Sequence, residues 1–91
     1  MFSLKYSSRF KKDLKSYKYN KELLSDLEEV LDILANGKSL PVKCHNHRLE
    51  GEFKDCFECH IKPNVLLIYG IEELEIAILL LRIGSHPDIF G

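Results

Sequence analysis

The spacing of the apolar residues changes partway along the chain, and this change limits the folds that the sequence can adopt. In residues 20–37, apolar side chains recur at intervals of three and four, which is the pattern of one buried helix face. They are Leu23, Leu27, Val30, Leu31 and Leu34. From residue 52 onward the interval becomes two, as in strands that bury one face. We therefore expect helices from the first part of the chain and a sheet from the second.

Three consecutive strands are expected in the second part of the chain. They cover residues 52–61, 65–71 and 76–83, and turn-forming residues separate them at 62–64 and 72–75. The middle strand is apolar on both faces, so we expect it to lie at the centre of the sheet.

The first 19 residues predict a short strand followed by a helix. Phe2, Leu4 and Tyr6 alternate with polar residues, and the helix is expected to begin at Ser7 or Ser8. The predicted fold class is α+β, with two N-terminal helices packed on a twisted antiparallel sheet in the order β-α-α-β-β-β. Because 91 residues can bury enough surface for one core, we expect residues 1–91 to form a single domain.

Composition argues against several classes of protein. The longest apolar runs, at 65–71 and 76–81, are far shorter than the roughly 20 residues of a membrane-spanning helix. The N-terminus lacks the apolar stretch of a secretory signal. The three cysteines are therefore expected to be reduced thiols in a cytoplasmic protein that makes no contact with a membrane.

The net charge of −1 conceals a segregation of charge along the chain. Seven of the thirteen basic residues precede position 22, whereas acidic residues cluster in residues 22–32. A basic first helix beside an acidic second helix allows a surface that faces phosphates on a nearly neutral protein. Two solvated helix faces that attract each other would give the same pattern.

Ionisable side chains lie where the predicted meander brings its outer strands together. His60 ends the first strand, and Arg82 and His86 lie at the end of the third, which runs in the same direction. The outer strands of such a meander lie roughly 10 Å apart, so their side chains can converge on one phosphate. Arg82 is suited to bind that phosphate. Glu58 shares the parity of His60 and could orient that imidazole or accept a proton itself.

Two imidazoles at such a site suit the cleavage of RNA. One group must take a proton from the ribose 2′-OH, and another must give a proton to the departing 5′-oxygen. Histidine can perform both roles near neutral pH. Phe90, four residues after His86, adds an aromatic ring on which a base can stack.

Several separated segments of the chain resemble, in order, the YafQ branch of the RelE-type bacterial toxins. The segments are residues 6–13, 49–64, 66–69 and 84–90. The resemblance implies a small α+β endoribonuclease of a type II toxin-antitoxin system, an mRNA interferase that cleaves messenger RNA by metal-independent acid-base chemistry. It also implies association with the ribosome, neutralisation by a cognate antitoxin protein, and no cofactor or metal.

The resemblance assigns functional positions to His47, His60, His86 and Phe90. We expect His86 to be the general acid, and either His60 or His47 to be the general base. The candidate catalytic residues are thus His47, Glu58, His60, Arg82 and His86, and the candidate substrate-binding residues are Lys54, Lys62, Asn64 and Phe90. The family has an acidic-aromatic pair where this chain has Asn64 and Val65. Asn64 can hydrogen-bond a ribose or a base but cannot take a proton at neutral pH.

Two alternatives remain open at the level of sequence. The chain could bind RNA or a protein partner without catalysis, because a shared fold does not establish an activity. It could also hold zinc, since Cys56 and Cys59 have C-x₂-C spacing and more candidate ligands lie upstream at Cys44, His45 and His47. Strand parity argues against zinc, because Cys56 and Cys59 would face opposite sides of the sheet.

Overall fold

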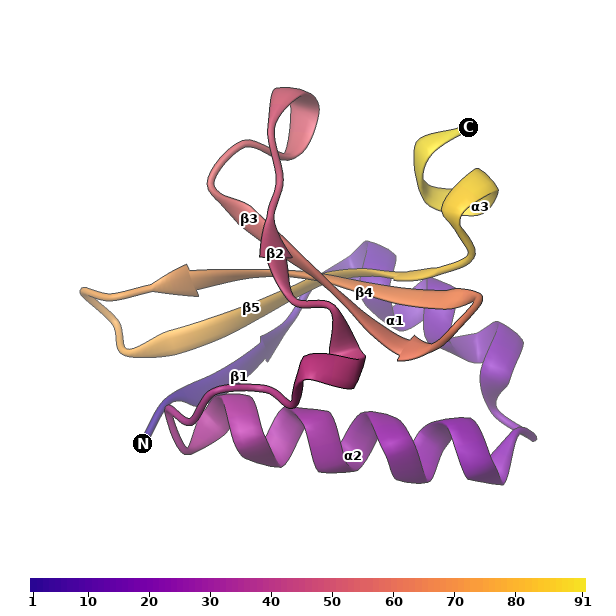
Figure 1. Ribbon diagram of the computed structural model, residues 1–91, viewed down its shortest axis with the longest axis horizontal. Coiled ribbons are helices and arrows are strands. Elements are labelled where there is room, and N and C mark those ends of the chain that lie inside the picture. The colour runs from indigo at the N-terminus through magenta and orange to yellow at the C-terminus, as the bar shows by residue number, and fades with distance from the viewer.

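A five-stranded sheet forms the centre of the molecule (Figure 1). The computed structural model describes residues 1–91 except for the side chain of Glu52. The strands are β1 (Ser3–Tyr6), β2 (His47–Arg48), β3 (Cys56–Lys62), β4 (Val65–Glu72) and β5 (Ala77–Gly84). The α-helices are α1 (Ser8–Leu14), α2 (Lys21–Ala35) and α3 (His86–Phe90), and short 3₁₀ turns are η1 (Lys15–Tyr17), η2 (Val42–Cys44) and η3 (Gly51–Phe53). The predicted α+β class is confirmed.

The strand order is β1-β5-β4-β3-β2, which places the doubly apolar β4 at the centre as expected. The sheet is mixed rather than wholly antiparallel, because β1 pairs in parallel with β5. Two elements, β2 and α3, are additional to the predicted order. The first strand of the meander begins at Cys56 and not at residue 52. Gly51 and Asp55 adopt positive φ angles of 73° and 69°, so the chain turns there before it extends.

The two faces of the sheet are covered differently. Helix α2 packs on one face, which we call the helix-covered face, and runs along the sheet in Figure 1. The buried residues of this face are Phe10, Leu23, Leu27, Val30, Leu34, Cys44, Cys59, Ile61, Val65, Leu67, Tyr69, Ile78, Leu80 and Ile83. The opposite face, called the second face, has a smaller buried cluster of Leu66, Ile68 and Ile89. Its cover comes from α3 and from the segment between β2 and β3.

Helix α1 lies beside the second half of β5, at the edge where β1 has ended. Strand β1 pairs only with Ala77–Leu80, so later backbone groups of β5 need other partners. The Ser7 hydroxyl donates a hydrogen bond to the Leu81 carbonyl at 2.9 Å, and the Asp13 carboxylate accepts one from the Ile83 N–H at 3.1 Å. Side chains at both ends of α1 thus replace the missing strand.

No helix within the described part of the chain combines the length and the apolar character needed to span a membrane.

Candidate active site

A row of side chains crosses the sheet from β2 to β5. His47 is the register partner of Glu58, Glu58 of Ile68, and Ile68 of Arg82. Directly paired residues of neighbouring antiparallel strands project on the same side of a sheet. Because Ile68 is buried in the cluster of the second face, the row belongs to that face. The sheet therefore brings an imidazole, a carboxylate and a guanidinium to one surface.

Glu58 contacts His47, with 3.1 Å between Glu58 Oε2 and His47 Nε2. Glu58 is only 7% exposed, whereas the His47 side chain is 54% exposed. A buried carboxylate needs a partner, and His47 provides it. The imidazole that Glu58 contacts is thus His47 and not His60, because the short strand β2 places His47 opposite Glu58.

His60 and His86 lie at the same end of the sheet. His60 is paired with Leu66, and Leu66 is paired with Gly84, two residues before His86. This arrangement agrees with the meander expected from the sequence. The His60 ring contacts the ring of His45 edge to face, with 5.5 Å between the centroids. His45 has a positive φ of 47°, which turns the chain toward β2.

Helix α3 holds His86 and Phe90 together. Ser85 caps the helix by accepting a hydrogen bond from the Asp88 N–H at 3.3 Å. The His86 and Phe90 rings lie one helical turn apart, with 4.7 Å between their centroids. Ile89 is buried at 9% exposure and anchors the helix, while Phe90 remains 38% exposed. The free part of the Phe90 ring is available to a ligand.

Arg82 is paired with Asp13 of α1. The Asp13 carboxylate accepts hydrogen bonds from Arg82 Nε at 2.7 Å and from Nη2 at 3.3 Å. The two side chains are 14% and 12% exposed. The guanidinium has five N–H donors, so three remain that Asp13 does not engage.

The candidate substrate-binding residues other than Phe90 lie in different surroundings. Asn64 is exposed in the turn between β3 and β4, and Lys54 is exposed after η3. Lys62 forms ion pairs with Asp26 and Glu22 of α2, and these hydrogen bonds raise the pKa of Lys62. Lys62 is thus engaged with protein carboxylates. Val65 is 7% exposed and belongs to the core of the helix-covered face.

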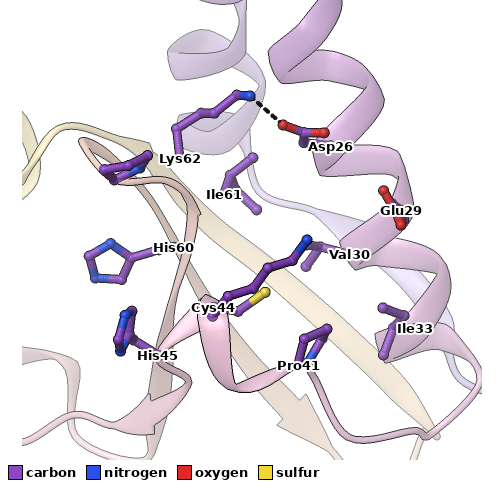
Figure 2. A pocket seen from close by; sticks show the side chains of 12 residues that line it. Asp26, Glu29, Val30, Ile33, Pro41, Cys44, His45, His60, Ile61 and Lys62 are labelled. Atoms are coloured by element: carbon purple, nitrogen blue, oxygen red, sulfur yellow. Dashed lines mark ion pairs between the residues drawn. The ribbon is translucent and has the colours of Figure 1, made fainter.

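A pocket of about 540 Å³ adjoins His60 between α2 and the end of β3. Figure 2 shows His45 and His60 side by side at one end of the pocket and the Lys62–Asp26 pair at another. Val30, Ile33 and Ile61 give it apolar walls, and the chain contributes both acidic and basic groups to its rim, so it has no single sign of charge.

The three thiols are divided between the two faces of the sheet. Cys44 and Cys59 are buried in the cluster of the helix-covered face, whereas Cys56 packs against the cluster of the second face. Burial raises the pKa of Cys59 to about 12. Among the described residues, no group of three or more His, Cys, Asp or Glu side chains is arranged to hold a metal ion. Cys56 and Cys59 thus lie on opposite faces of the sheet, as their strand parity predicts.

The sequence did not indicate Asp13 as a site residue, and it indicated His45 only as a candidate zinc ligand. Asp13 lies 69 residues before Arg82, and no local pattern predicts that pair. His45 has a weak signal, because it lies next to the predicted site residue His47 in a segment rich in polar residues.

The chain is similar to known proteins over nearly its whole length. The model of the family described as "Bacterial toxin of type II toxin-antitoxin system, YafQ" matches residues 2–91. The mRNA interferase toxin YafQ of Escherichia coli strain K12 is 27% identical over 89 residues, which cover 97% of this chain and 95% of that protein.

Solved structures also resemble the whole chain. A metal-bound toxin from Helicobacter pylori is 40% identical, with a TM-score of 0.91 over 99% of this chain and 100% of that one. The E. coli DinJ-YafQ complex contains a chain that is 26% identical, with a TM-score of 0.86 and 100% of both chains covered.

The fold and the matches define a toxin of a bacterial type II toxin-antitoxin system. Within that class, the chain belongs to the YafQ family.

Proposed function

We propose that this toxin is an mRNA interferase, an endoribonuclease whose residues 1–91 form one RelE-like toxin domain. The observation that carries the proposal is the joint placement of the His47–Glu58 pair, Arg82 and His86 on and beside the second face. The E. coli relative is named as an mRNA interferase, which supports the same activity.

In the proposed reaction, His47 removes the proton from a ribose 2′-OH while Glu58 holds its imidazole in position. The 2′-oxygen then forms a bond to phosphorus, and the bond between phosphorus and the 5′-oxygen breaks. His86 gives a proton to the leaving 5′-oxygen. The products are a 2′,3′-cyclic phosphate and a 5′-hydroxyl, and each proton-transfer group is expected to contribute 10²- to 10⁴-fold in rate.

The contact with Glu58 favours His47 over His60 as the base. A carboxylate beside an imidazole fixes its tautomer and stabilises the protonated ring that forms when the base takes a proton. His60 lies against His45 instead. If the assignment is correct, replacing His47 with Ala lowers the rate of cleavage more than replacing His60 with Ala. The reverse ranking in single-turnover rates would make His60 the base.

Arg82 and Phe90 complete the proposed site. Arg82 binds nonbridging oxygens of the scissile phosphate with the N–H groups that Asp13 leaves free. The exposed part of Phe90 stacks on a base next to the cleaved bond. Asn64, exposed in its turn, hydrogen-bonds the ribose or a base, and Lys54 contributes positive charge toward the RNA backbone.

The proposed partners follow from the family. A cognate antitoxin binds and neutralises this toxin. The support is that the similar E. coli toxin YafQ forms a complex with DinJ. The toxin acts in the cytoplasm on messenger RNA at the ribosome and needs no metal or cofactor.

A cleavage assay in a chelating buffer tests this function. A defined RNA is incubated with the purified protein, and with the His86→Ala variant as the control. We expect discrete fragments that end in a 2′,3′-cyclic phosphate from the wild type only. An intact RNA with a retarded gel band would instead support a non-catalytic RNA-binding protein. Cleavage that requires added divalent metal would contradict the metal-independent mechanism.

A further inference from the structure

We infer that Asp13 is a positioning residue for RNA cleavage, which fixes the guanidinium of Arg82 in the orientation that binds the scissile phosphate. The inference rests on the proposed function and adds a residue from α1 to a site that otherwise comes from the sheet and α3. The family resemblance includes residues 6–13 but assigns no functional role to Asp13.

The contact is well defined in geometry. Asp13 Oδ2 lies 2.7 Å from Arg82 Nε, and Asp13 Oδ1 lies 3.3 Å from Arg82 Nη2. Because the guanidinium is planar, two hydrogen bonds from one carboxylate fix both its position and the orientation of its plane. The three remaining N–H groups then have fixed directions as well.

Asp13 is itself held in place. Its Oδ2 atom also accepts a hydrogen bond from the Ile83 N–H at 3.1 Å, on the strand that carries Arg82. Arg9, one turn earlier in α1, contributes a further contact at 3.7 Å. The carboxylate is therefore tied to the backbone of β5 at a point adjacent to the arginine that it orients. A flexible surface pair would lack this connection.

The environment makes the pair stronger than an exposed ion pair. The Arg82 and Asp13 side chains are 14% and 12% exposed, whereas those of the Lys5–Glu75 pair are 48% and 61% exposed. An exposed pair such as Lys5–Glu75 contributes little to a fixed side-chain geometry, because water and salt screen the attraction between its charges. Arginine keeps its charge beside the carboxylate, so positioning does not remove its attraction for phosphate.

The first variant is Asp13→Asn. Asparagine keeps an oxygen at the position of Oδ2, which accepts from the Ile83 N–H and from Arg82 Nε, but it places an NH₂ group where Oδ1 accepts from Arg82 Nη2. We expect kcat to fall by roughly 10- to 100-fold, because small misplacements of a catalytic group have effects of this size. The KM for RNA and the melting temperature should change little. Glu75→Gln, which removes the exposed Lys5–Glu75 pair, is the matched control and should leave kcat unchanged.

A double-variant cycle tests whether Asp13 acts through Arg82. If it does, Asp13→Asn has no further effect on kcat in an Arg82→Ala protein, because the group that it positions is absent. An equal loss in both backgrounds would overturn the inference and assign Asp13 a separate role. An unchanged kcat for Asp13→Asn alone, with an active wild type, would overturn it as well.

An NMR measurement tests the positioning without activity. The Nε–H proton of Arg82 should exchange slowly with solvent in the wild type and rapidly in Asp13→Ala, which removes the Oδ2 acceptor, and Glu75→Gln should not alter it. Rapid exchange in the wild type would contradict the inference. If the wild type protects this proton but cleaves no RNA, the proposed function fails while the contact stands.

Discussion

The two faces of the sheet differ in what covers them. On the helix-covered face, α2 and the sheet bury a continuous apolar cluster. On the second face, a small cluster lies beside the His47–Glu58 contact and the Arg82–Asp13 ion pair, and the cover comes from short segments. Most of the buried apolar core thus lies on the helix-covered face, whereas the proposed catalytic residues lie on or beside the second face. A substitution on one side should therefore change either stability or activity and leave the other nearly intact.

The largest effect is expected on the second face, for His86→Ala. This variant removes the proposed general acid, so the single-turnover rate of cleavage should fall by about 10²- to 10⁴-fold. The midpoint of urea unfolding should change little, because His86 is exposed. Asn64→Ala is the control and should lower the single-turnover rate of cleavage much less than His86→Ala. A His86→Ala protein that cleaves RNA at the wild-type rate would end the assignment.

On the helix-covered face, Leu67→Ala should have the opposite signature. Leu67 is fully buried in the central strand, so its truncation should lower the free energy of unfolding by about 2–5 kcal/mol. The rate per folded molecule, measured well below the melting temperature, should stay close to that of the wild type. If the folded variant lost activity in proportion to its stability, the two faces would be coupled more tightly than we propose.

Phe90→Ala should give a smaller effect that appears in binding. The loss of one stacked base is expected to weaken RNA binding by about 1–3 kcal/mol, which gel-shift titration of a non-cleavable RNA would measure. Because Phe90 also contacts Phe53 and His86, Phe90→Leu is a useful companion that restores apolar volume without an aromatic face. Equal binding by Phe90→Leu and the wild type would argue against stacking.

The smallest expected effect is a dependence of the free energy of unfolding on alkaline pH, which comes from ionisable groups of the helix-covered face. Burial raises the pKa of Cys59 from 9.0 to about 12, and raises that of Tyr69 from 10.0 to about 12. The unfolded chain therefore loses these protons at lower pH than the folded protein. The contribution of these two groups to the free energy of unfolding should be complete below about pH 9 and should decrease as the pH rises toward about 12.

Urea unfolding at a series of alkaline pH values measures this dependence. Cys59→Ala serves as the control, since it should show a shallower decrease whatever its stability at neutral pH. An equal slope for Cys59→Ala and the wild type would exclude the thiol as a source of the effect. Both unfolding measurements are made without RNA and do not depend on the proposed activity.

The sequence predicts the central parts of the fold because those parts have periodicity. The run of apolar residues in β4 indicates a strand buried on both faces, and the helical spacing from Leu23 to Leu34 indicates the buried face of α2. Strand β2 has only two residues, so it can show no period. Helix α3 is short, yet Ser85 and Asp88 have the spacing of a helix cap that could have predicted it.

The sequence predicts several residues of the candidate site but not the contacts between them. Local motifs mark His60, His86 and Phe90, but partners depend on register, which the sequence does not fix. An irregularity between Ile68 and Tyr69 leaves Leu81 without a register partner in β4 and determines which side Arg82 faces. The pairing of Arg82 with Asp13 depends in addition on where β1 ends. These are properties of the folded sheet rather than of any segment.

The position of α1 also affects how molecules of this toxin can associate. An open strand edge invites another chain to add to the sheet, and such additions lead to aggregates. Beyond Leu80, the free edge of β5 is blocked by α1, whose Ser7 and Asp13 side chains already occupy its Leu81 carbonyl and Ile83 N–H. This part of the β5 edge is therefore closed to strand addition by a second copy of the chain.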